Sequence, residues 1–341
     1  MTVDAITDVA GVRVGHATRS GDGWLTGTTV VLAPEGGAVV AVDVRGGGPG
    51  TKETDALDPR NVVTRVDAVV LTGGSAYGLD AASGVMAWLE ERQRGVRVGT
   101  DPAHVVPVVP AACVFDLGRG GDFCARPDAD TGRAAVEAAA RAAVGARVPE
   151  GCVGAGTGAV VGLIKGGVGS ASATLDSGVT VAALAVVNAA GSAIEPETGA
   201  LYGELCQGRV EYPEQSVHEF ARWRLDETAA RNAQPPLNTT LAVVATDAKL
   251  SKAQAQKLAG TAHDGIARAV RPVHLMNDGD TVFALATGAR SLAEHPLVLN
   301  EILAAGADVV TRAIVRGVHA AESVDGPGGA WPSYGELYGA R

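Results

Sequence analysis

An asparagine and a hydroxyl residue, Asn238 and Thr239, stand where a loop with prolines at 235 and 236 meets the β-type apolar residues 241–245. A self-cleaving precursor needs this arrangement, because a presented peptide bond must be followed by a nucleophile that becomes a new N-terminus held in a sheet. Cleavage of the Asn238–Thr239 bond would place a hydroxyl and a free α-amine on one residue. Such an amine has a pKa of about 7.7–8.0 and can act as base for its own hydroxyl. The junction therefore predicts an N-terminal-nucleophile hydrolase, with Thr240 as the alternative nucleophile.

Lys165 and Asn188 each follow apolar residues, and each has two interpretations. Lys165 lies within residues 160–168, where it is either a snorkelling surface lysine or a cation that lowers the amine's pKa and stabilises negative charge. Asn188 ends the apolar residues 182–187, either as a turn residue or as an amide donor to the oxyanion formed when Thr239 attacks a carbonyl. Both residue types therefore fit a role beside the nucleophile.

A pair of carboxylates lies in Asn277-Asp278-Gly279-Asp280, directly before a predicted strand. Asp-Gly is a strong signal for a hairpin turn, so a turn is one interpretation. The other rests on extended geometry, in which residues two apart point the same way. Asp278 and Asp280 would then orient Thr239, as the acid of a catalytic triad orients its base. The segment is too short for the calcium loop of an EF-hand.

The sequence lacks the marks of an ordinary serine hydrolase and of a nucleotide-binding protein. Its seven histidines are scattered, and Ser75, in Gly73-Gly74-Ser75-Ala76, does not belong to a G-x-S-x-G motif. We expect Ser75 to be the N-cap of a helix. The glycines of residues 154–158 and 46–50 lack the complete dinucleotide and P-loop patterns. No metal or organic cofactor is implied.

Composition limits the class of protein. A chain of 341 residues with 46% hydrophobic and 19% charged residues is long enough for one large domain or two small ones. The net charge of −10 argues against nucleic acid and anionic membranes as partners. Four cysteines without a C-x-x-C pair, and no signal-peptide pattern, favour a reduced, cytoplasmic protein. The longest apolar run, residues 179–187, is too short to span a bilayer.

Short apolar runs alternate with helical patterns along the chain. Several runs are apolar on successive residues, as in strands covered on both faces. We expect strands at residues 28–32, 38–44, 68–71, 105–109, 153–163, 179–187, 241–245 and 281–286. We expect helices across residues 79–89, 133–143, 216–229, 258–270 (with Ser251 as the N-cap) and 299–314. The mixture predicts a layered α/β fold with helices outside the sheets and no interdomain linker.

Five segments together resemble one family over nearly the whole chain. They are residues 6–16, 45–58, 71–78, 154–158 with Lys165, and 238–247. On these segments the chain resembles the L-aminopeptidase/D-esterase family of self-processing hydrolases, which also contains β-aminopeptidases and nylon-oligomer hydrolases. The resemblance implies a single hydrolase domain over residues 1–341, folded as a four-layer α/β/β/α sandwich. This fold is similar to that of N-terminal-nucleophile hydrolases, with altered connectivity.

The resemblance also implies roles for the candidate residues. The family's nucleophile falls on Thr239, its active-site Lys and Asn fall on Lys165 and Asn188, and the assisting pair falls on Asp278 and Asp280. In the aminopeptidases the nucleophile is a Ser after Gly, and the pair is Ser and Glu. The Asn-Thr junction and the Asp-Gly-Asp segment of this chain instead resemble the nylon-oligomer hydrolases. Those enzymes carry a Tyr where this chain has Phe115, which removes a phenolic donor.

The implied precursor becomes an α-subunit of residues 1–238 and a β-subunit of residues 239–341, which stay together and assemble as a tetramer of αβ heterodimers. The expected activity is hydrolysis of an amide through an acyl-enzyme on Thr239, with a small molecule, a short peptide or a 6-aminohexanoate oligomer as substrate. Peptides, β-amino acid amides, esters and polyamide oligomers all remain open. Two alternatives are acyl transfer to an amine on the same fold, and an uncleaved homologue that is not an enzyme.

Overall fold

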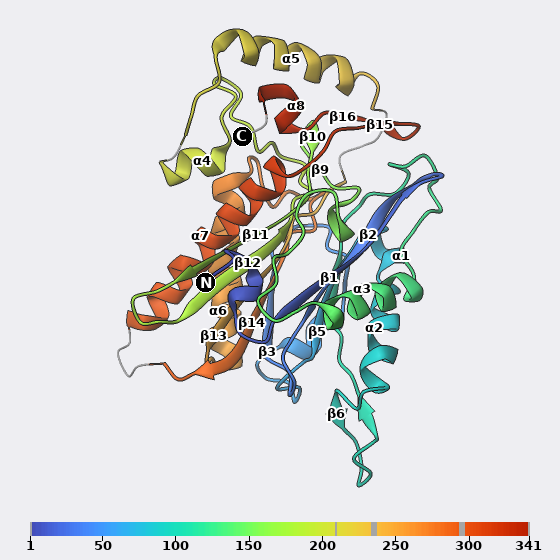
Figure 1. Ribbon diagram of the computed structural model, residues 1–341, viewed down its shortest axis with the longest axis vertical. Helices are drawn as coiled ribbons and strands as arrows, with labels where there is room; N and C mark the ends of the chain where they lie inside the picture. Colours follow the sequence, from blue (N-terminus) through green and yellow to red (C-terminus); the bar gives the residue numbers. More distant parts are fainter. Residues whose placement is uncertain (1, 209, 233–236, 293–296, 340–341) are drawn as a thin grey trace.

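Two five-stranded sheets lie face to face in the computed structural model, which describes residues 2–208, 210–232, 237–292 and 297–339 (Figure 1). The first sheet has the order β1-β2-β5-β8-β4, and its strands are β1 (Arg13–Gly21), β2 (Trp24–Leu32), β5 (Ala68–Thr72), β8 (Ala111–Cys113) and β4 (Thr51–Lys52). The second has the order β11-β12-β13-β14-β3, and its strands are β11 (Val168–Thr174), β12 (Thr180–Val186), β13 (Leu241–Ala248), β14 (Thr281–Arg290) and β3 (Val39–Val44).

Helices cover the outer face of each sheet. The first sheet packs against α2 (Ala81–Glu90) and α3 (Ala129–Arg141). The second packs against α6 (Lys252–Ala269) and α7 (Leu297–His319), which lie on the opposite side of the molecule (Figure 1). The layers are therefore helix, sheet, sheet, helix, which confirms the predicted four-layer sandwich.

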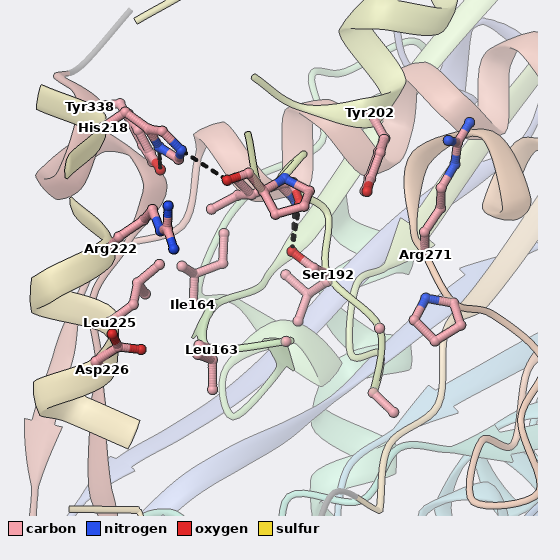
Figure 2. Close-up of a pocket in the computed structure, with 17 residues that line it drawn as sticks. Leu163, Ile164, Ser192, Tyr202, His218, Arg222, Leu225, Asp226, Arg271 and Tyr338 are labelled. Carbon is pink, nitrogen blue, oxygen red and sulfur yellow. Dashed lines mark hydrogen bonds between the residues drawn. The ribbon is translucent and has the colours of Figure 1, made fainter. Parts of the chain in front are cut away.

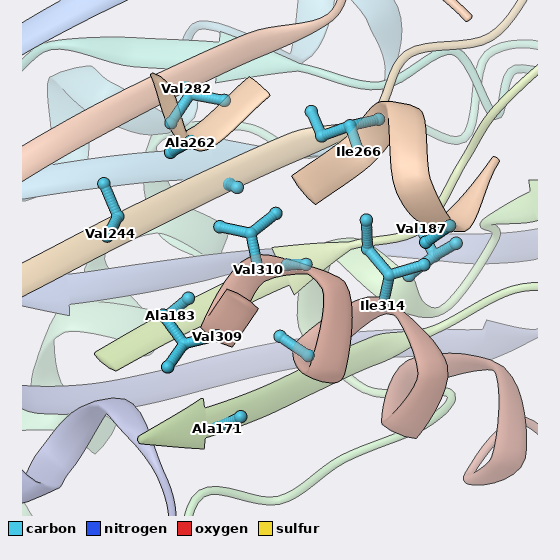
Figure 3. Close-up of a cluster of buried hydrophobic side chains, with 14 of the residues drawn as sticks. Ala171, Ala183, Val187, Val244, Ala262, Ile266, Val282, Val309, Val310 and Ile314 are labelled. Atoms are coloured by element: carbon cyan, nitrogen blue, oxygen red, sulfur yellow. The ribbon is translucent and has the colours of Figure 1, made fainter. Parts of the chain in front are cut away.

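Three apolar clusters fill the spaces between these layers. Between the sheets, Val31 and Leu71 of the first sheet pack with Leu184 and Phe283 of the second. A second cluster joins the second sheet to its helices, and Figure 3 shows Val310 of α7 within it. The third lies between the first sheet and α2 and α3. Strands of the second sheet are buried on both faces, which explains why their sequences are apolar on successive residues.

Small residues bring the helices close to the sheets. A Cβ at Gly15 of β1 would overlap the backbone of Ala139 in α3, and one at Gly169 of β11 would overlap that of Ala313 in α7. The abundance of glycine and alanine in the sequence therefore serves close contact between layers.

The connection from β13 to β14 decides where the candidate residues meet. The two strands are parallel, and Leu241 pairs with Thr281 at their N-terminal ends. They are joined through α6, which begins after Ser251; the Ser251 Oγ accepts a hydrogen bond from the Gln254 N–H, as an N-cap does. The predicted N-cap is confirmed. The hairpin interpretation of residues 277–280 is wrong. The strand that follows them, β14, is parallel to β13, the preceding strand in the chain, and a hairpin joins antiparallel strands.

The remaining elements are short. The described 3-10 helices are η1 (Ile6–Asp8), η2 (Thr54–Leu57) and η3 (Gly154–Gly156). The other helices are α1 (Ser75–Gly78), α4 (Tyr202–Gln207), α5 (Gln215–Ala229) and α8 (Tyr334–Tyr338). Six strands form two-stranded pairs: β6 (Val96–Arg97) with β7 (Val105–Val106), β9 (Val160–Val161) with β10 (Ile164–Lys165), and β15 (Val324–Gly326) with β16 (Gly329–Trp331). Within the described ranges no helix is long and apolar enough to cross a membrane.

Three local expectations were wrong. The strand predicted at residues 153–163 is instead η3 followed by the two-residue β9, because Gly154 and Gly162 take φ values of +51° and +58° that an extended strand does not allow. The strand predicted at residues 105–109 shortens to Val105–Val106. Ser75 is not an N-cap but the first residue of α1, and Gly74 occupies the cap position without a side-chain bond.

Candidate active site

Thr239 and the bond before it are buried at the N-terminal edge of β13. Thr239 is 4% exposed, and its Oγ1 donates a hydrogen bond of 2.6 Å to the carbonyl oxygen of Asn238. The Gly279 N–H donates to that same oxygen at 3.1 Å. The Thr239 N–H, which belongs to the bond predicted to break, donates to the Asn188 carbonyl at 2.5 Å. Hydroxyl, carbonyl and an N–H donor are thus assembled around one peptide bond. The prolines at 235 and 236 lie outside the described residues.

The acidic pair reaches this edge because parallel strands begin on the same side of a sheet. Asp280 directly precedes β14, and its Oδ1 accepts the N–H of Thr240 at 2.7 Å. Asp278 accepts the N–H of Ala190 at 3.3 Å and that of Leu275 at 2.9 Å. Burial, together with the charge of Asp280, raises the pKa of Asp278. Among the described residues, neither carboxylate bonds the Oγ1 of Thr239 in this uncleaved chain, so their predicted role in orienting the nucleophile stays a prediction.

A histidine holds the second carboxylate. His274 donates from its backbone N–H and pairs through Nδ1 with the Oδ2 of Asp280, at 3.1 and 2.7 Å. Its φ of +59° is a left-handed conformation that is uncommon for a residue with a side chain. The ring of His263 packs edge-on against it, with centroids 4.9 Å apart. His274 therefore fixes Asp280 from the side opposite Thr240.

Asn188 is oriented by a buried arginine that the sequence analysis missed. Arg119 Nη1 donates to the Asn188 Oδ1 at 2.5 Å, and the Val160 N–H donates to the same atom at 3.0 Å. Because a guanidinium only donates, the amide must present its oxygen to Arg119 and its Nδ2 to the other side. That Nδ2 has a long bond of 3.5 Å to the Phe115 carbonyl. The arrangement leaves an amide donor directed away from Arg119, as an oxyanion-stabilising role requires.

Lys165 is fully buried, so the interpretation as a snorkelling surface lysine is wrong. Its Nζ donates to the carbonyls of Gly156 and Gly166, at 3.0 and 2.7 Å. Burial lowers its pKa to about 8, and the charge of Arg119 adds to this effect. These bonds do not reach Thr239, and the predicted contact of Lys165 with the nucleophile stays a prediction.

Arg119 and Asp116 form a second buried charge group beside the candidates. Arg119 is 6% exposed, and burial lowers its pKa to about 10 against the opposing pull of Asp116. Burial raises the pKa of Asp116, which accepts hydrogen bonds from the Thr26 hydroxyl at 2.7 Å and the Gly74 N–H at 2.6 Å. The only signal in the sequence is an acid and a base three residues apart in an otherwise apolar and glycine-rich segment.

A cavity of about 260 Å³ opens directly onto Thr239. The side chains of Cys113, Phe115, Leu237 and Met276 contribute to its wall. The other lining residues are Gly48, Pro49, Gly50, Ser75, Ala76, Asn238, Thr239 and Asn277. Burial raises the pKa of the Cys113 thiol to about 12, so this thiol is neutral. No described lining residue carries a formal charge.

A larger cavity of about 520 Å³ lies beneath α5, and its lining includes none of the candidate residues (Figure 2). Its Ser192 hydroxyl bonds the backbone of Ile194, at 3.0 and 2.9 Å. Both ring nitrogens of His218 are also occupied, by Tyr338 and by the Pro196 carbonyl, each at 3.0 Å. The Ser192 hydroxyl and the His218 ring are therefore engaged with other groups and do not form a nucleophile–base pair in this cavity. Among the described residues, no group of three His, Cys, Asp or Glu side chains gathers as a metal site.

Comparison with solved structures shows that the chain has the fold of N-terminal-nucleophile hydrolases. An L-aminopeptidase D-Ala-esterase/amidase of Ochrobactrum anthropi, described as a variant of this fold, superposes with a TM-score of 0.73 at 22% identity, over 99% of this chain and 97% of that one. A Burkholderia sp. beta-aminopeptidase gives 0.72 at 24% identity, over 98% and 91%.

The chain belongs to peptidase family S58, whose model matches residues 4–331. An uncharacterised aminopeptidase of Mycobacterium tuberculosis (strain ATCC 25618 / H37Rv) is 47% identical over 352 residues, covering 98% of each protein. A 6-aminohexanoate-oligomer endohydrolase of Kocuria sp. (strain KY2) is 31% identical over 299 residues, covering 85% of this chain and 76% of that protein. The chain is thus an amide hydrolase of the aminopeptidase class, related to nylon-oligomer hydrolases.

Proposed function

We propose that the chain cleaves itself between Asn238 and Thr239, and that Thr239 then hydrolyses substrate amides as an N-terminal nucleophile. The observation that carries this proposal is the set of contacts at one peptide bond. The Thr239 Oγ1 lies 2.6 Å from the Asn238 carbonyl oxygen, and the Gly279 N–H donates to that oxygen at 3.1 Å. Family membership supports the amide chemistry, and the geometry supports the choice of atom.

The self-cleavage proceeds in two steps. The Thr239 Oγ1 attacks the Asn238 carbonyl carbon, the C–N bond breaks, and an ester forms while the nitrogen gains a proton. Water then hydrolyses the ester and leaves a carboxylate on Asn238 and a free amine on Thr239. Negative charge develops on the carbonyl oxygen during attack, where the Gly279 N–H strengthens its hydrogen bond. The hydrogen bond from the Thr239 N–H to the Asn188 carbonyl fixes the plane of the Asn238–Thr239 peptide bond during the attack.

In the mature protein the Thr239 amine accepts the proton from its own hydroxyl, which attacks the substrate amide. The Asn188 Nδ2 and the Lys165 cation stabilise the oxyanion of the tetrahedral intermediate. Asp278 and Asp280 hold the new N-terminus, since Asp280 already bonds the N–H of Thr240. The amine departs, an acyl-enzyme remains, and water releases the acyl group. These steps require only the chain's own residues and water.

The uncleaved geometry supports Thr239 over Thr240. The Thr240 Oγ1 is buried and has no hydrogen-bond partner among the described residues, whereas the Thr239 Oγ1 lies against the carbonyl that must be attacked. Intact mass spectrometry of the purified protein tests the position directly. A fragment that begins at Thr239 is expected, and one that begins at Thr240, or an uncleaved chain with full activity, would overturn the proposal.

Substitution of the nucleophile tests its role in catalysis. Thr239→Ala should remain one chain and lose amide hydrolysis by at least about a thousand-fold, because it lacks the attacking atom. Thr239→Ser keeps the oxygen and should be processed. Both variants and the wild type are assayed on amino acid anilides, β-amino acid amides, esters and 6-aminohexanoate oligomers, the last because of the relation to nylon-oligomer hydrolases. Addition of an amine acceptor shows whether water or an amine takes the acyl group.

A further inference from the structure

Residue 238 is held at three points, one for each of its functional groups. Its N–H donates to the Asn277 carbonyl at 3.3 Å, and its carbonyl accepts from the Gly279 N–H at 3.1 Å. Its side-chain Oδ1 accepts from the Arg119 Nη2 at 2.7 Å. In self-cleavage Asn238 supplies the acyl group. These contacts therefore recognise an acyl residue by its backbone nitrogen, its reacting carbonyl and a side-chain oxygen on the γ carbon.

Arg119 keeps its place independently of Asn238. Its Nη1 donates to the Gly158 carbonyl at 2.6 Å and to the Asn188 Oδ1 at 2.5 Å. The Arg119 side chain is buried, and Gly328 fits against its backbone so closely that a Cβ there would overlap it. Loss of one of three acceptors therefore leaves the guanidinium anchored in the same position.

The charge of Arg119 is not matched by a direct ion pair. Its three acceptors are neutral oxygens, and within the described ranges no carboxylate forms a salt bridge with it. The charge of Asp116 raises the pKa of Arg119, but the carboxylate oxygens of Asp116 accept hydrogen bonds from Thr26 and Gly74 instead. Lys165, a second buried cation, adds positive potential nearby. Because buried charges are costly unless they are paired, this arrangement favours an incoming anion.

Departure of the Asn238 end after cleavage would connect Arg119 to the substrate cavity. Asn238 lines the cavity of about 260 Å³ and also bonds Arg119, which is not in the cavity lining. Asn238 therefore lies between Arg119 and the cavity. We propose that the place of Asn238 becomes the acyl subsite of the mature protein, and that Arg119 selects acyl residues with an oxygen on the γ carbon, aspartyl before asparaginyl. This inference rests on the proposed function and deepens it.

The expected selectivity among acyl groups follows from the hydrogen bond that each side chain can accept from Arg119. An L-aspartyl group presents a carboxylate to Arg119, an L-asparaginyl group presents a neutral amide oxygen, and L-leucine has the same shape with no acceptor. A hydrogen bond between charged groups is worth enough for a preference of about 10- to 100-fold over the apolar isostere. The Asn277 carbonyl would accept the free amine of the L-aminoacyl group, as it accepts the N–H of residue 238.

The experiment compares kcat/KM of the processed wild type for the 4-nitroanilides of L-aspartate, L-asparagine and L-leucine. We expect the order Asp, Asn, Leu, with about 10- to 100-fold between the first and the last. In Arg119→Gln the Asp/Leu ratio should fall to near one. The matched control is Arg94→Gln, which should leave the ratio unchanged. Arg94 is partly buried and bonds Asp67 and two carbonyls away from this site.

Arg119→Gln could fail to fold or to cleave, so a second measurement leaves Arg119 intact. The time course of self-cleavage is followed in Asn238→Asp and Asn238→Leu; the Asp variant should cleave at a rate near the wild type, and the Leu variant about 10- to 100-fold more slowly. A leucine anilide turned over as well as the aspartate anilide by cleaved, Thr239-dependent enzyme would overturn this inference alone. Absence of cleavage and of Thr239-dependent activity would instead overturn the proposed function.

Discussion

At the scale of single residues, Gly279 lies against both the carbonyl and the hydroxyl of the proposed cleavage. Its N–H donates to the Asn238 carbonyl at 3.1 Å, and a Cβ added to it would lie 2.6 Å from the Thr239 Oγ1. Gly279→Ala should therefore displace the nucleophile and slow self-cleavage by about 100-fold or more, since each misplaced group at a reacting centre costs about that much. Gly326→Ala is the matched control, because a Cβ at Gly326 meets nothing within 4 Å.

A gel time course of freshly expressed precursor measures both glycine variants, with circular dichroism to confirm the fold. Equal rates for Gly279→Ala and the wild type would show that the space between residue 279 and the Thr239 Oγ1 is not needed for cleavage.

Lys165 gives the protein a pH dependence of stability whose sign is set by its burial. Its pKa falls from 10.5 to about 8 on folding. Between these values the unfolded chain holds the proton that the folded chain has released. The free energy of unfolding therefore rises with pH in this window, by about 1.4 kcal/mol per pH unit at most, and does not change from this source below pH 8.

Lys165→Met removes this contribution, so its stability should rise less steeply than that of the parent between pH 8 and 10. Denaturant unfolding in the Thr239→Ala background, which keeps both proteins as one chain, measures the difference. Parallel curves for the two proteins would contradict the assignment.

At the scale of elements, the loop between α6 and β14 carries the acidic pair, and His274 holds that loop. His274 bonds the Asp280 Oδ2 at 2.7 Å while it takes a φ of +59°. His274→Leu should slow self-cleavage and turnover about 10-fold, because Asp280 loses a charge-assisted bond. His274→Asn should retain most of the rate, because asparagine tolerates the left-handed conformation and offers a donor near the position of Nδ1.

Cleavage rates of the two variants, each measured with its melting temperature, separate positioning from stability. If His274→Asn and His274→Leu are equally slow at equal stability, the donor to Asp280 does not matter.

The sequence predicted those elements whose signal is local. Apolar runs predicted four strands of the second sheet, β3, β12, β13 and β14, and the Ser251 cap predicted the start of α6. Burial on both faces and capping each leave a direct pattern in the sequence. Strands β1 and β11 were missed because they are rich in Gly, Ser and Thr where α3 and α7 press against them. Their strand state depends on their neighbours in the fold.

The candidate site divides in the same way. Thr239 and the acidic pair could be named from the sequence, because each lies at the start of an apolar strand. Arg119 could not, because its place in the site depends on contacts with Asn188 and Asn238, which are 69 and 119 residues away along the chain. The same holds for the pairing of His274 with Asp280, since a histidine in a loop has many possible partners.

For the whole molecule, the position of the proposed cut decides how the two fragments behave. Cleavage before Thr239 would assign β13 and β14 to one chain, while β11, β12 and β3 stay with the other. The second sheet is then shared, with β13 hydrogen-bonded to β12 on one side and β14 to β3 on the other. Helices α6 and α7, which cover that sheet, also belong to the second chain.

The two chains should therefore behave as one folded unit, because they share the apolar clusters on both faces of the sheet. An interface made of a divided hydrophobic core is of the kind that permanent complexes have. Size-exclusion chromatography of processed protein should give one peak that contains both fragments, with a single melting transition, and only guanidinium should separate them. The uncleaved Thr239→Ala protein, run beside it, should elute at the same volume. Fragments that separate on a native column would show that the sheet does not persist across the cut, and that the active site cannot be built from residues of both chains.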